Sequence, residues 1–222
     1  MNRARLFCKA LKSPASLFVL SLFGVLSVMV AGNLWRGPDI FITGFLQSRP
    51  SESLDCAATS LSWIGSAELT GAVSVFIFFF LWKRLGPDTA LAFGGALGLA
   101  TAAEIAFKVF LPQMPIPDSL HRACGDLPQG FIHVPTPNSF PSGHTFRTTF
   151  LLFMIIRIYS FFYRSPITDH RSLFFSLCLL FVLLMAVSRV YIGDHWLSDV
   201  LGGILLAWAA VLWVPVEKRL LR

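Results

Sequence analysis

The amino-acid sequence predicts an all-α membrane protein with six membrane-spanning helices in a single domain that covers residues 1–222. Hydrophobic residues make up 55% of the chain and charged residues only 14%, whereas soluble domains carry about 25% charged residues. The apolar residues also come in long runs, and a helix that crosses a bilayer needs roughly 20 of them. Six such spans with short connections use nearly the whole chain and leave no length for a second soluble domain.

The first apolar run, at about residues 15–32, contains no charged residue and follows a basic segment. A signal peptide also begins with basic residues, but its apolar core is usually about 7 to 15 residues long. We therefore expect a helix that is retained. The second span is expected at about residues 60–82, with Glu68 near its start.

The third span is expected at about residues 89–110, and three prolines soon after it end the helix because proline lacks the backbone N–H that a helix interior needs. A fourth span begins after Gly143. The remaining boundaries follow from the apolar runs alone, and they place the last three spans at about residues 145–163, 172–188 and 196–216.

The 18 Lys and Arg residues give a formal net charge of +6 and stand at the ends of the spans rather than in one patch. This pattern indicates lipid headgroups, and not nucleic acid, as the partner. Twelve of these residues fall on the side of both termini and six on the opposite side. The positive-inside rule then predicts cytoplasmic termini. Three segments are expected to face outward, at about residues 33–59, 111–143 and 191–195.

A charged group inside a predicted span or at its end is costly and marks a functional site by default, and six such ionisable residues form a cluster. Because consecutive spans run in opposite directions, the end of an odd span and the start of an even span lie on the same side of the bilayer. All six residues are therefore expected at the outer leaflet: Lys108, His144, Arg147, Arg189, His195 and Asp199.

The chemistry of this cluster favours an anion with a group that can be transferred. One lysine and two arginines supply charge-assisted donors, and the planar fork of arginine matches phosphate geometry. The segment Pro141-Ser142-Gly143-His144 opens a helix. Free backbone N–H groups and the positive end of the helix dipole bind anions there, so Ser142 and Gly143 join the candidate phosphate ligands.

His195 and Asp199 are four residues apart at the start of a helix and therefore share a face. A carboxylate in that place fixes the imidazole tautomer and supports a positive charge on the ring. A histidine held in this way can attack phosphorus, with a second histidine as the proton donor. The alternative is that the pair serves only as a helix cap.

The pattern Ser-Arg-x5-His-x3-Asp, from Ser188 to Asp199, follows the Pro-Ser-Gly-His segment by about 45 residues. Together they resemble the type 2 phosphatidic acid phosphatase (PAP2) superfamily, and the similarity extends more loosely over all six spans. The resemblance implies a PAP2-like helical core and a metal-independent phosphatase without a cofactor. It also implies a role for each residue: His195 as the nucleophile that forms a phosphohistidine, Asp199 as its orienting carboxylate, His144 as the proton donor to the leaving oxygen, and Lys108, Ser142, Gly143 and Arg189 as ligands of the phosphate oxygens.

The sequence departs from the family in its first motif, whose usual form is Lys-x6-Arg-Pro. Here Lys108 is followed by Val-Phe-Leu-Pro-Gln-Met-Pro, so no arginine precedes Pro115. Arg147 is a candidate replacement because it lies one turn after His144 on the same helix face. Arg122 is a second candidate. The alternative for Arg147 is that its side chain reaches the lipid headgroups by snorkelling.

The expected function is hydrolysis of a phosphomonoester or pyrophosphate of a membrane lipid, because the site lies at the depth of the headgroups. Relatives in bacteria act on polyprenyl pyrophosphate, phosphatidylglycerophosphate, phosphatidic acid or lipid A phosphate, and we favour the first, such as undecaprenyl pyrophosphate. The resemblance implies the inner membrane of a bacterium, with the site facing the periplasm or exterior. Two other functions stay open: a lipid-to-lipid phosphotransferase, and an inactive phospholipid-binding membrane protein.

Cys56 and Cys124 both fall in the segments that are expected to face outward. An oxidising exterior would permit a disulfide between them, and two free thiols are the alternative. The spacing of the histidines and cysteines does not match that of a metal site.

Overall fold

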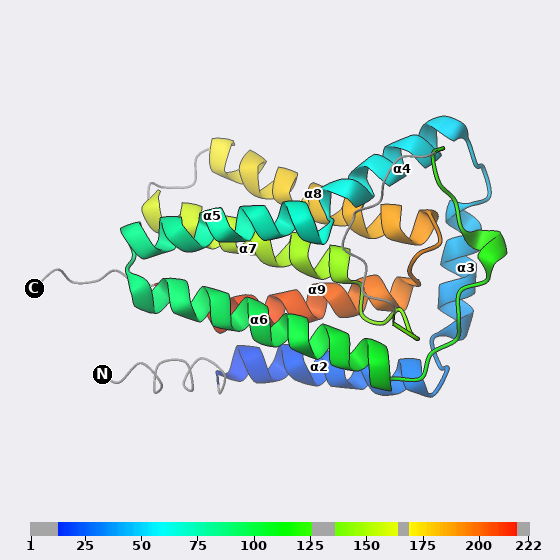
Figure 1. The fold of residues 1–222 in the computed structure, drawn as a ribbon, viewed down its shortest axis with the longest axis horizontal. Coiled ribbons are helices and arrows are strands. Elements are labelled where there is room, and N and C mark those ends of the chain that lie inside the picture. The colour runs from blue at the N-terminus through cyan, green and yellow to red at the C-terminus, as the bar shows by residue number, and fades with distance from the viewer. Residues whose placement is uncertain (1–12, 126–135, 164–168, 217–222) are drawn as a thin grey trace, which may run out of the picture.

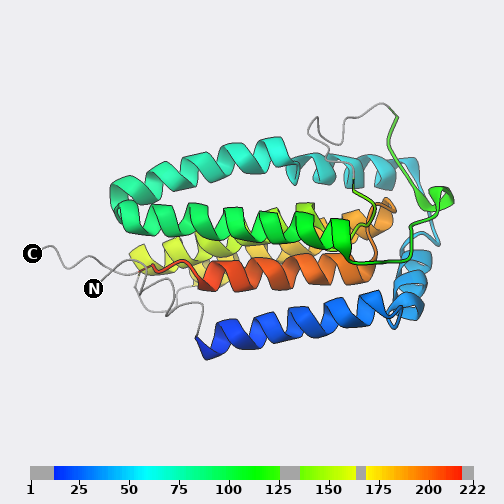
Figure 2. The same cartoon turned by 60° about the horizontal axis from the view of Figure 1, so that its bottom comes forward.

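The computed structural model describes residues 13–125, 136–163 and 169–216, and these residues form helices without any strand (Figure 1). The prediction of an all-α fold is therefore confirmed. The long helices run side by side, and α3 stands across one end of the bundle (Figures 1 and 2). In chain order the helices are α2 (Pro14–Ala31), α3 (Arg36–Leu46), α4 (Glu52–Ile64), α5 (Ala67–Arg84), α6 (Pro87–Phe110), the short 3-10 helix η1 (Asp118–Leu120), α7 (Gly143–Phe162), α8 (Asp169–Tyr191) and α9 (Leu197–Leu212).

Helix α9 lies at the centre of the bundle, where it packs against α2, α6, α7 and α8. Small residues allow this close packing, because a Cβ atom added at Gly203 would lie only 2.6 Å from the carbonyl oxygen of Ser142. A Cβ atom at Gly202 would lie 2.5 Å from the ring of Phe140. The close approach holds the starts of α7 and α9 together, and both carry candidate site residues.

Four described helices are long and apolar enough to cross a bilayer: α2, α6, α7 and α8. Helices α4 and α5 give a fifth span if the pair, which is bent by 40°, is counted as one. Helix α9 is apolar but has only 16 residues, whereas a span needs roughly 20. The structure therefore supports four or five spans, and the predicted number of six is not confirmed.

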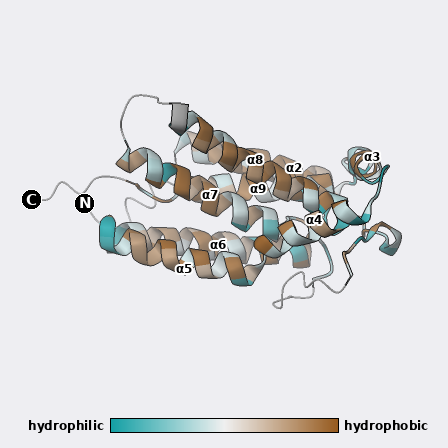
Figure 3. Cartoon of the chain, turned by 90° about the horizontal axis from the view of Figure 1, so that it is seen from above, coloured by the Kyte–Doolittle hydropathy of each residue, from teal (hydrophilic) through white to brown (hydrophobic). Residues whose placement is uncertain are grey.

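Large apolar side chains cover the outside of the bundle, as expected for helices that contact lipid. Val28, Phe76 and Phe110 are each more than 70% exposed. Figure 3 shows hydrophobic residues along most of the helix length, and hydrophilic residues at the α5–α6 turn and around α3. The bundle therefore has an apolar belt between its two ends, and α3, at one of these ends, exposes Phe41 and Phe45 as well as polar residues.

The second span, predicted at about residues 60–82, is not one continuous helix. Helix α4 ends at Ile64, and Ser66 starts α5 as an N-cap whose hydroxyl accepts a hydrogen bond from the backbone N–H of Leu69. A Cβ atom at Gly65 would lie 2.9 Å from the Met185 side chain and 3.2 Å from Cδ2 of His144. The break therefore lets the backbone pass close to a predicted site residue.

Residues 33–59 were expected to form an outer loop, but they contain α3 and the first half of α4. A buried carboxylate holds α3 in place: the two oxygens of Asp39 accept hydrogen bonds from the backbone N–H and the hydroxyl of Ser198, each at 2.9 Å. Burial raises the pKa of Asp39 to about 6. The segment is thus fixed across the end of the bundle by a contact with α9.

The end of α6, the start of α7, the end of α8 and the start of α9 meet at the end of the bundle that α3 covers (Figure 1). The start of α2 and the end of α9 lie at the opposite end. Cys56 and Cys124 form a disulfide that ties α4 to the segment after η1. The structure thus gathers the candidate residues at one end and covers that end with polar connections.

Candidate active site

The turn between α8 and α9 presents His195. Its Nδ1 atom lies 3.1 Å from Oδ2 of Asp199, in the first turn of α9, and the same oxygen accepts a hydrogen bond of 3.0 Å from the backbone N–H of Trp196. Asp199 is completely buried. Burial lowers the pKa of His195, while the Asp199 carboxylate opposes that shift. This pairing is the one that the spacing of the two residues predicts.

The start of α7 lies directly beside this pair. The backbone N–H of Ser142 donates a 2.9 Å hydrogen bond to the carbonyl oxygen of Asp199, and the hydroxyl of Thr145 donates to that of Ser142 at 3.1 Å. No side chain fits at Gly143, because an added Cβ atom would lie 2.1 Å from Oε1 of Glu104. The first turn of α7 is therefore locked against both α9 and α6.

His144 faces the same region. Its Nε2 atom is buried and has no hydrogen-bond partner in the described part of the chain. The charged groups that act on it are Arg189, Arg147, His195 and Lys108. The structure thus brings the two histidines and the three predicted cations together around one point.

Arg189 is almost fully buried and has two partners. It donates one hydrogen bond to the hydroxyl of Ser62, at the end of α4, and another of 2.6 Å to Oδ2 of Asp194. Its Nε atom has no hydrogen-bond partner among the described residues. Asp194 also lies 3.3 Å from Nδ1 of His121. The guanidinium is therefore held in a fixed direction from both sides.

Lys108 and Arg147 share one carboxylate. Nζ of Lys108 lies 3.0 Å from Oε1 of Glu104, and a terminal nitrogen of Arg147 lies 3.5 Å from Oε2. Glu104 is 4% exposed. Arg147 therefore does not reach out to headgroups by snorkelling but lies inside the bundle in an ion-pair cluster beside Gly143.

Arg122, the second candidate for the missing arginine, lies elsewhere. Its guanidinium binds both carboxylate oxygens of Asp55 at 2.7 and 2.8 Å, and the hydroxyl of Tyr191 binds the same carboxylate at 2.7 Å. This contact lowers the pKa of Asp55 and raises that of Arg122. Arg122 is therefore part of the polar cover around the disulfide.

Gln113 is a site residue that the sequence analysis missed. It lies in the segment after α6, and its amide contacts Asp199 as well as the residues just before Pro141. Nothing in the periodicity or spacing marks it, because its partners lie 26 to 86 positions away. Ser62 was missed for a similar reason, because its partner Arg189 is 127 positions away. Asp194 was also missed, although it lies only five positions from Arg189.

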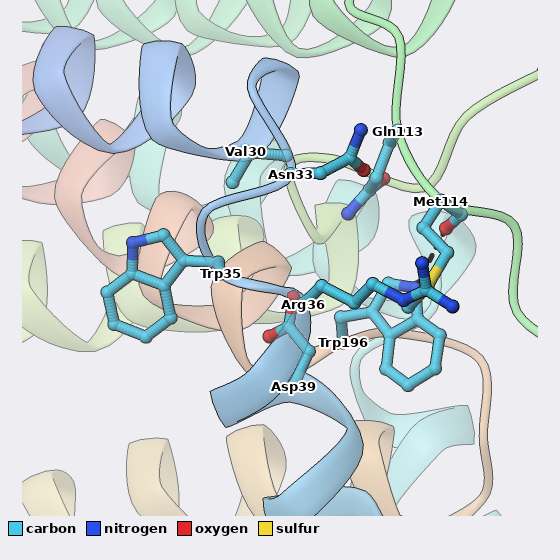
Figure 4. Close-up of a pocket in the computed structure, with 8 residues that line it drawn as sticks. All are labelled: Val30, Asn33, Trp35, Arg36, Asp39, Gln113, Met114 and Trp196. Carbon is cyan, nitrogen blue, oxygen red and sulfur yellow. Dashed lines mark hydrogen bonds between the residues drawn. The ribbon is translucent and has the colours of Figure 1, made fainter.

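A small pocket lies on the outer side of the start of α9, beside the candidate site (Figure 4). The indole of Trp196 forms one wall and donates a 2.9 Å hydrogen bond to the carbonyl oxygen of Met114. Arg36 extends across this indole in the figure. The residues around the pocket are Val30, Asn33, Trp35, Arg36, Asp39, Gln113, Met114 and Trp196.

Among the residues that the structure describes, no group of three or more His, Cys, Asp or Glu side chains is arranged to hold a metal ion. The charges around the two histidines come instead from lysine and arginine. Lysine and arginine side chains can form charge-assisted hydrogen bonds to anions.

Comparison with known proteins agrees with this geometry. A solved structure, described as the first transmembrane PAP2 type phosphatidylglycerolphosphate phosphatase from Bacillus subtilis, matches with a TM-score of 0.69 and 21% identity, over 91% of this chain and 94% of that one. At this identity the match shows the fold alone. No curated protein matches. The family model for the PAP2 superfamily matches residues 89–218, which include all eight predicted site residues. Since this match covers more than half of the chain, the protein belongs to the PAP2 superfamily.

Proposed function

We propose that this membrane protein is a lipid phosphate phosphatase that works through a phosphohistidine on His195. The observation that carries the proposal is the His195–Asp199 pair, which lies near His144, the buried Arg189 and the partly buried Lys108 and Arg147 at one end of the bundle. Nδ1 of His195 is engaged by Asp199, so the lone pair for attack belongs to Nε2. Burial lowers the pKa of His195 and so favours the neutral ring that attack requires.

The proposed reaction has two steps. In the first, Nε2 of His195 forms a bond to phosphorus, the bond from phosphorus to the lipid oxygen breaks, and His144 gives that oxygen a proton. In the second, water attacks phosphorus, His144 takes the proton, and the bond to His195 breaks to release inorganic phosphate. Asp199 stabilises the positive charge on the ring in the intermediate.

The phosphate oxygens have several donors at the site. The proposed ligands are the backbone at the start of α7, which has unpaired N–H groups, and the side chains of Lys108 and Arg189, together with Ser142 and Gly143. Arg147 is proposed as the replacement for the arginine that the first motif lacks. This assignment is supported by its place one turn into α7, where its guanidinium lies close to Gly143.

The proposed substrate is a lipid, since the site lies where an apolar belt meets a polar end. We favour polyprenyl pyrophosphate; phosphatidylglycerophosphate, phosphatidic acid and lipid A phosphate are the other candidates. The chain is proposed to be one domain of six spans, with α9 as the last, in the inner membrane of a bacterium. Both termini would be cytoplasmic and the site would face the periplasm or exterior.

The test is phosphate release from each of these four lipids by purified protein in detergent. His195→Ala and His144→Ala should each abolish release while the thermal unfolding temperature changes little. His170→Ala is the matched control, because it lies at the far end of α8 from Arg189. Addition of a chelator should leave the rate unchanged; loss of turnover that added divalent metal restores would contradict the mechanism. Phosphate that appears on a second lipid would identify a phosphotransferase.

A further inference from the structure

The segment after α6 does not deliver an arginine to the site but turns a glutamine toward α9. Gln113 lies five residues after Lys108, close to where the family motif carries its arginine. Its side-chain Nε2 donates a short hydrogen bond to Oδ1 of Asp199. The segment therefore contacts the carboxylate behind the nucleophile instead of the phosphate.

This contact completes the hydrogen bonding of the Asp199 carboxylate. Oδ2 is engaged by Nδ1 of His195 and by the backbone N–H of Trp196, and Oδ1 is engaged by Gln113. The carboxylate is fully buried, so its orientation depends on these donors and not on water. Gln113 is the one that comes from outside the α8–α9 segment.

The other end of the Gln113 amide binds the segment that leads into the phosphate turn. Oε1 accepts hydrogen bonds from the backbone N–H of Ser139 at 3.2 Å, from its hydroxyl at 2.9 Å and from the backbone N–H of Phe140 at 3.0 Å. Pro141, Ser142 and Gly143 follow directly. One side chain thus links the carboxylate that orients His195 to the turn that carries His144.

We propose that Gln113 is a positioning residue that sets the direction of the Asp199 carboxylate and holds the two catalytic histidines in a fixed position relative to each other. This inference rests on the proposed function. Only a neutral amide suits the place, because it donates on one side and accepts on the other. A carboxylate would face Asp199 without a donor, and an apolar side chain would leave Oδ1 of Asp199 buried without its partner.

Three variants separate this role from simple anchoring of the loop. Gln113→Met removes both contacts, and Gln113→Glu keeps the shape but donates to Asp199 only when protonated. Asn138→Ala is the matched control, because Asn138 holds the same loop to the carbonyl oxygen of Lys108 through its backbone N–H and its side chain, at 3.2 and 3.1 Å, and only the second bond would be lost.

In wild-type protein that releases phosphate, Gln113→Met should lower kcat about ten- to hundredfold and change KM by less than about threefold. Four ionisable groups interact electrostatically with the His195–Asp199 pair: Arg189, Lys108, His144 and Asp39. None of them is changed by these variants. At lower pH, the carboxylate introduced by Gln113→Glu and that of Asp199 should share one proton. The ratio of the kcat of Gln113→Glu to that of wild type should therefore rise as the pH falls from about 7.5 to about 5.5.

Two results would overturn the proposal: kcat within twofold of wild type in Gln113→Met, or an equal loss of kcat in Asn138→Ala. If instead the proposed function is wrong, the wild type will release no more phosphate than His195→Ala does. In that event NMR titration of the His195 imidazole still tests Gln113. Its pKa should rise in Gln113→Met, because a carboxylate that loses a donor attracts the imidazolium more strongly; an unchanged pKa would contradict the role.

Discussion

Glu104 is a carboxylate placed between two of the cations that we propose to bind phosphate. It contacts Lys108 and Arg147 while almost completely buried, and Gly143 packs against its carboxylate. A lone lysine or arginine at this depth would be costly, and a carboxylate between them lowers that cost. Glu104 therefore fixes both cations next to the start of α7, where a phosphate oxygen would compete for the same donors.

Arg147 gives the first test at the residue scale. A charge-assisted hydrogen bond contributes about 1.5–3 kcal/mol, so Arg147→Ala should lower kcat/KM about ten- to hundredfold. Arg147→Lys should also lower it, by less, because lysine keeps the charge but lacks the planar fork. Steady-state phosphate release from the preferred lipid measures both.

Arg122→Ala is the companion variant, because Arg122 is engaged by Asp55 outside the site. It should keep most of the activity and lose some thermal stability. Near wild-type turnover in both Arg147 variants, together with an inactive Arg122→Ala, would assign the missing phosphate ligand to Arg122 instead.

The acid limb of the pH profile is a second test at this scale. An ordinary histidine has a pKa near 6.5, and burial lowers that of His195. Attack needs the neutral ring, so kcat/KM should fall only as the pH drops through the lowered pKa, below about 6.5. Initial rates between about pH 4.5 and pH 8 measure this limb, and an acid limb centred above pH 7 would contradict the assignment of His195 as the nucleophile.

At the scale of elements, hydropathy located the long helices but not the breaks between them. Helices α2, α6, α7 and α8 lie where the apolar runs are. The break between α4 and α5 was missed because Gly65 and Ser66 interrupt a run that stays apolar on both sides. Glycine followed by serine is a common signature of a helix end and a new N-cap, so a local signal was present.

The candidate site also contains residues that could be predicted from the sequence and residues that could not. His195 and Asp199 could be paired from the sequence because they lie one helical turn apart. Lys108, His144 and Arg189 could be placed together because the spans alternate in direction. Gln113 could not be predicted, since its contact with Asp199 depends on how a segment without regular structure folds over α9.

The disulfide joins two elements and provides a test at this scale. Cys56 and Cys124 connect the first turns of α4 to the segment after η1, next to the Asp55–Arg122 pair. Replacing both cysteines with serine should lower the free energy of unfolding by about 2–4 kcal/mol, seen as a lower thermal unfolding temperature. Reductant should destabilise the wild type in the same way and leave the double variant unchanged.

Cys178 is buried within α8 and serves as an internal reference thiol. Mass spectrometry of denatured protein without reduction should show Cys178 alkylated and Cys56 linked to Cys124. Alkylation of Cys56 and Cys124 in that sample would contradict the bond.

At the scale of the whole molecule, the distribution of Lys and Arg predicts the orientation. The sequence assigns six basic residues to the side of the site and twelve to the side of the termini, and four of the six are paired with acids. Eight of the twelve lie outside the described residues. Lys83 and Arg84 are described, and they are exposed at the α5–α6 turn. Lys and Arg near the ends of the spans favour the cytoplasmic side, and acidic residues contribute little to this bias.

The orientation can be tested with single cysteines at the two ends of the bundle. In a background with Cys8→Ser and Cys178→Ala, Ser119→Cys should react with an impermeant thiol reagent in intact cells, because Ser119 is exposed in η1 at the site end. Lys83→Cys should react only after the membrane is permeabilised. The reverse pattern would place the site in the cytoplasm. Such a site would meet its lipid phosphate in the inner leaflet, so the proposed substrate would have to present its phosphate there.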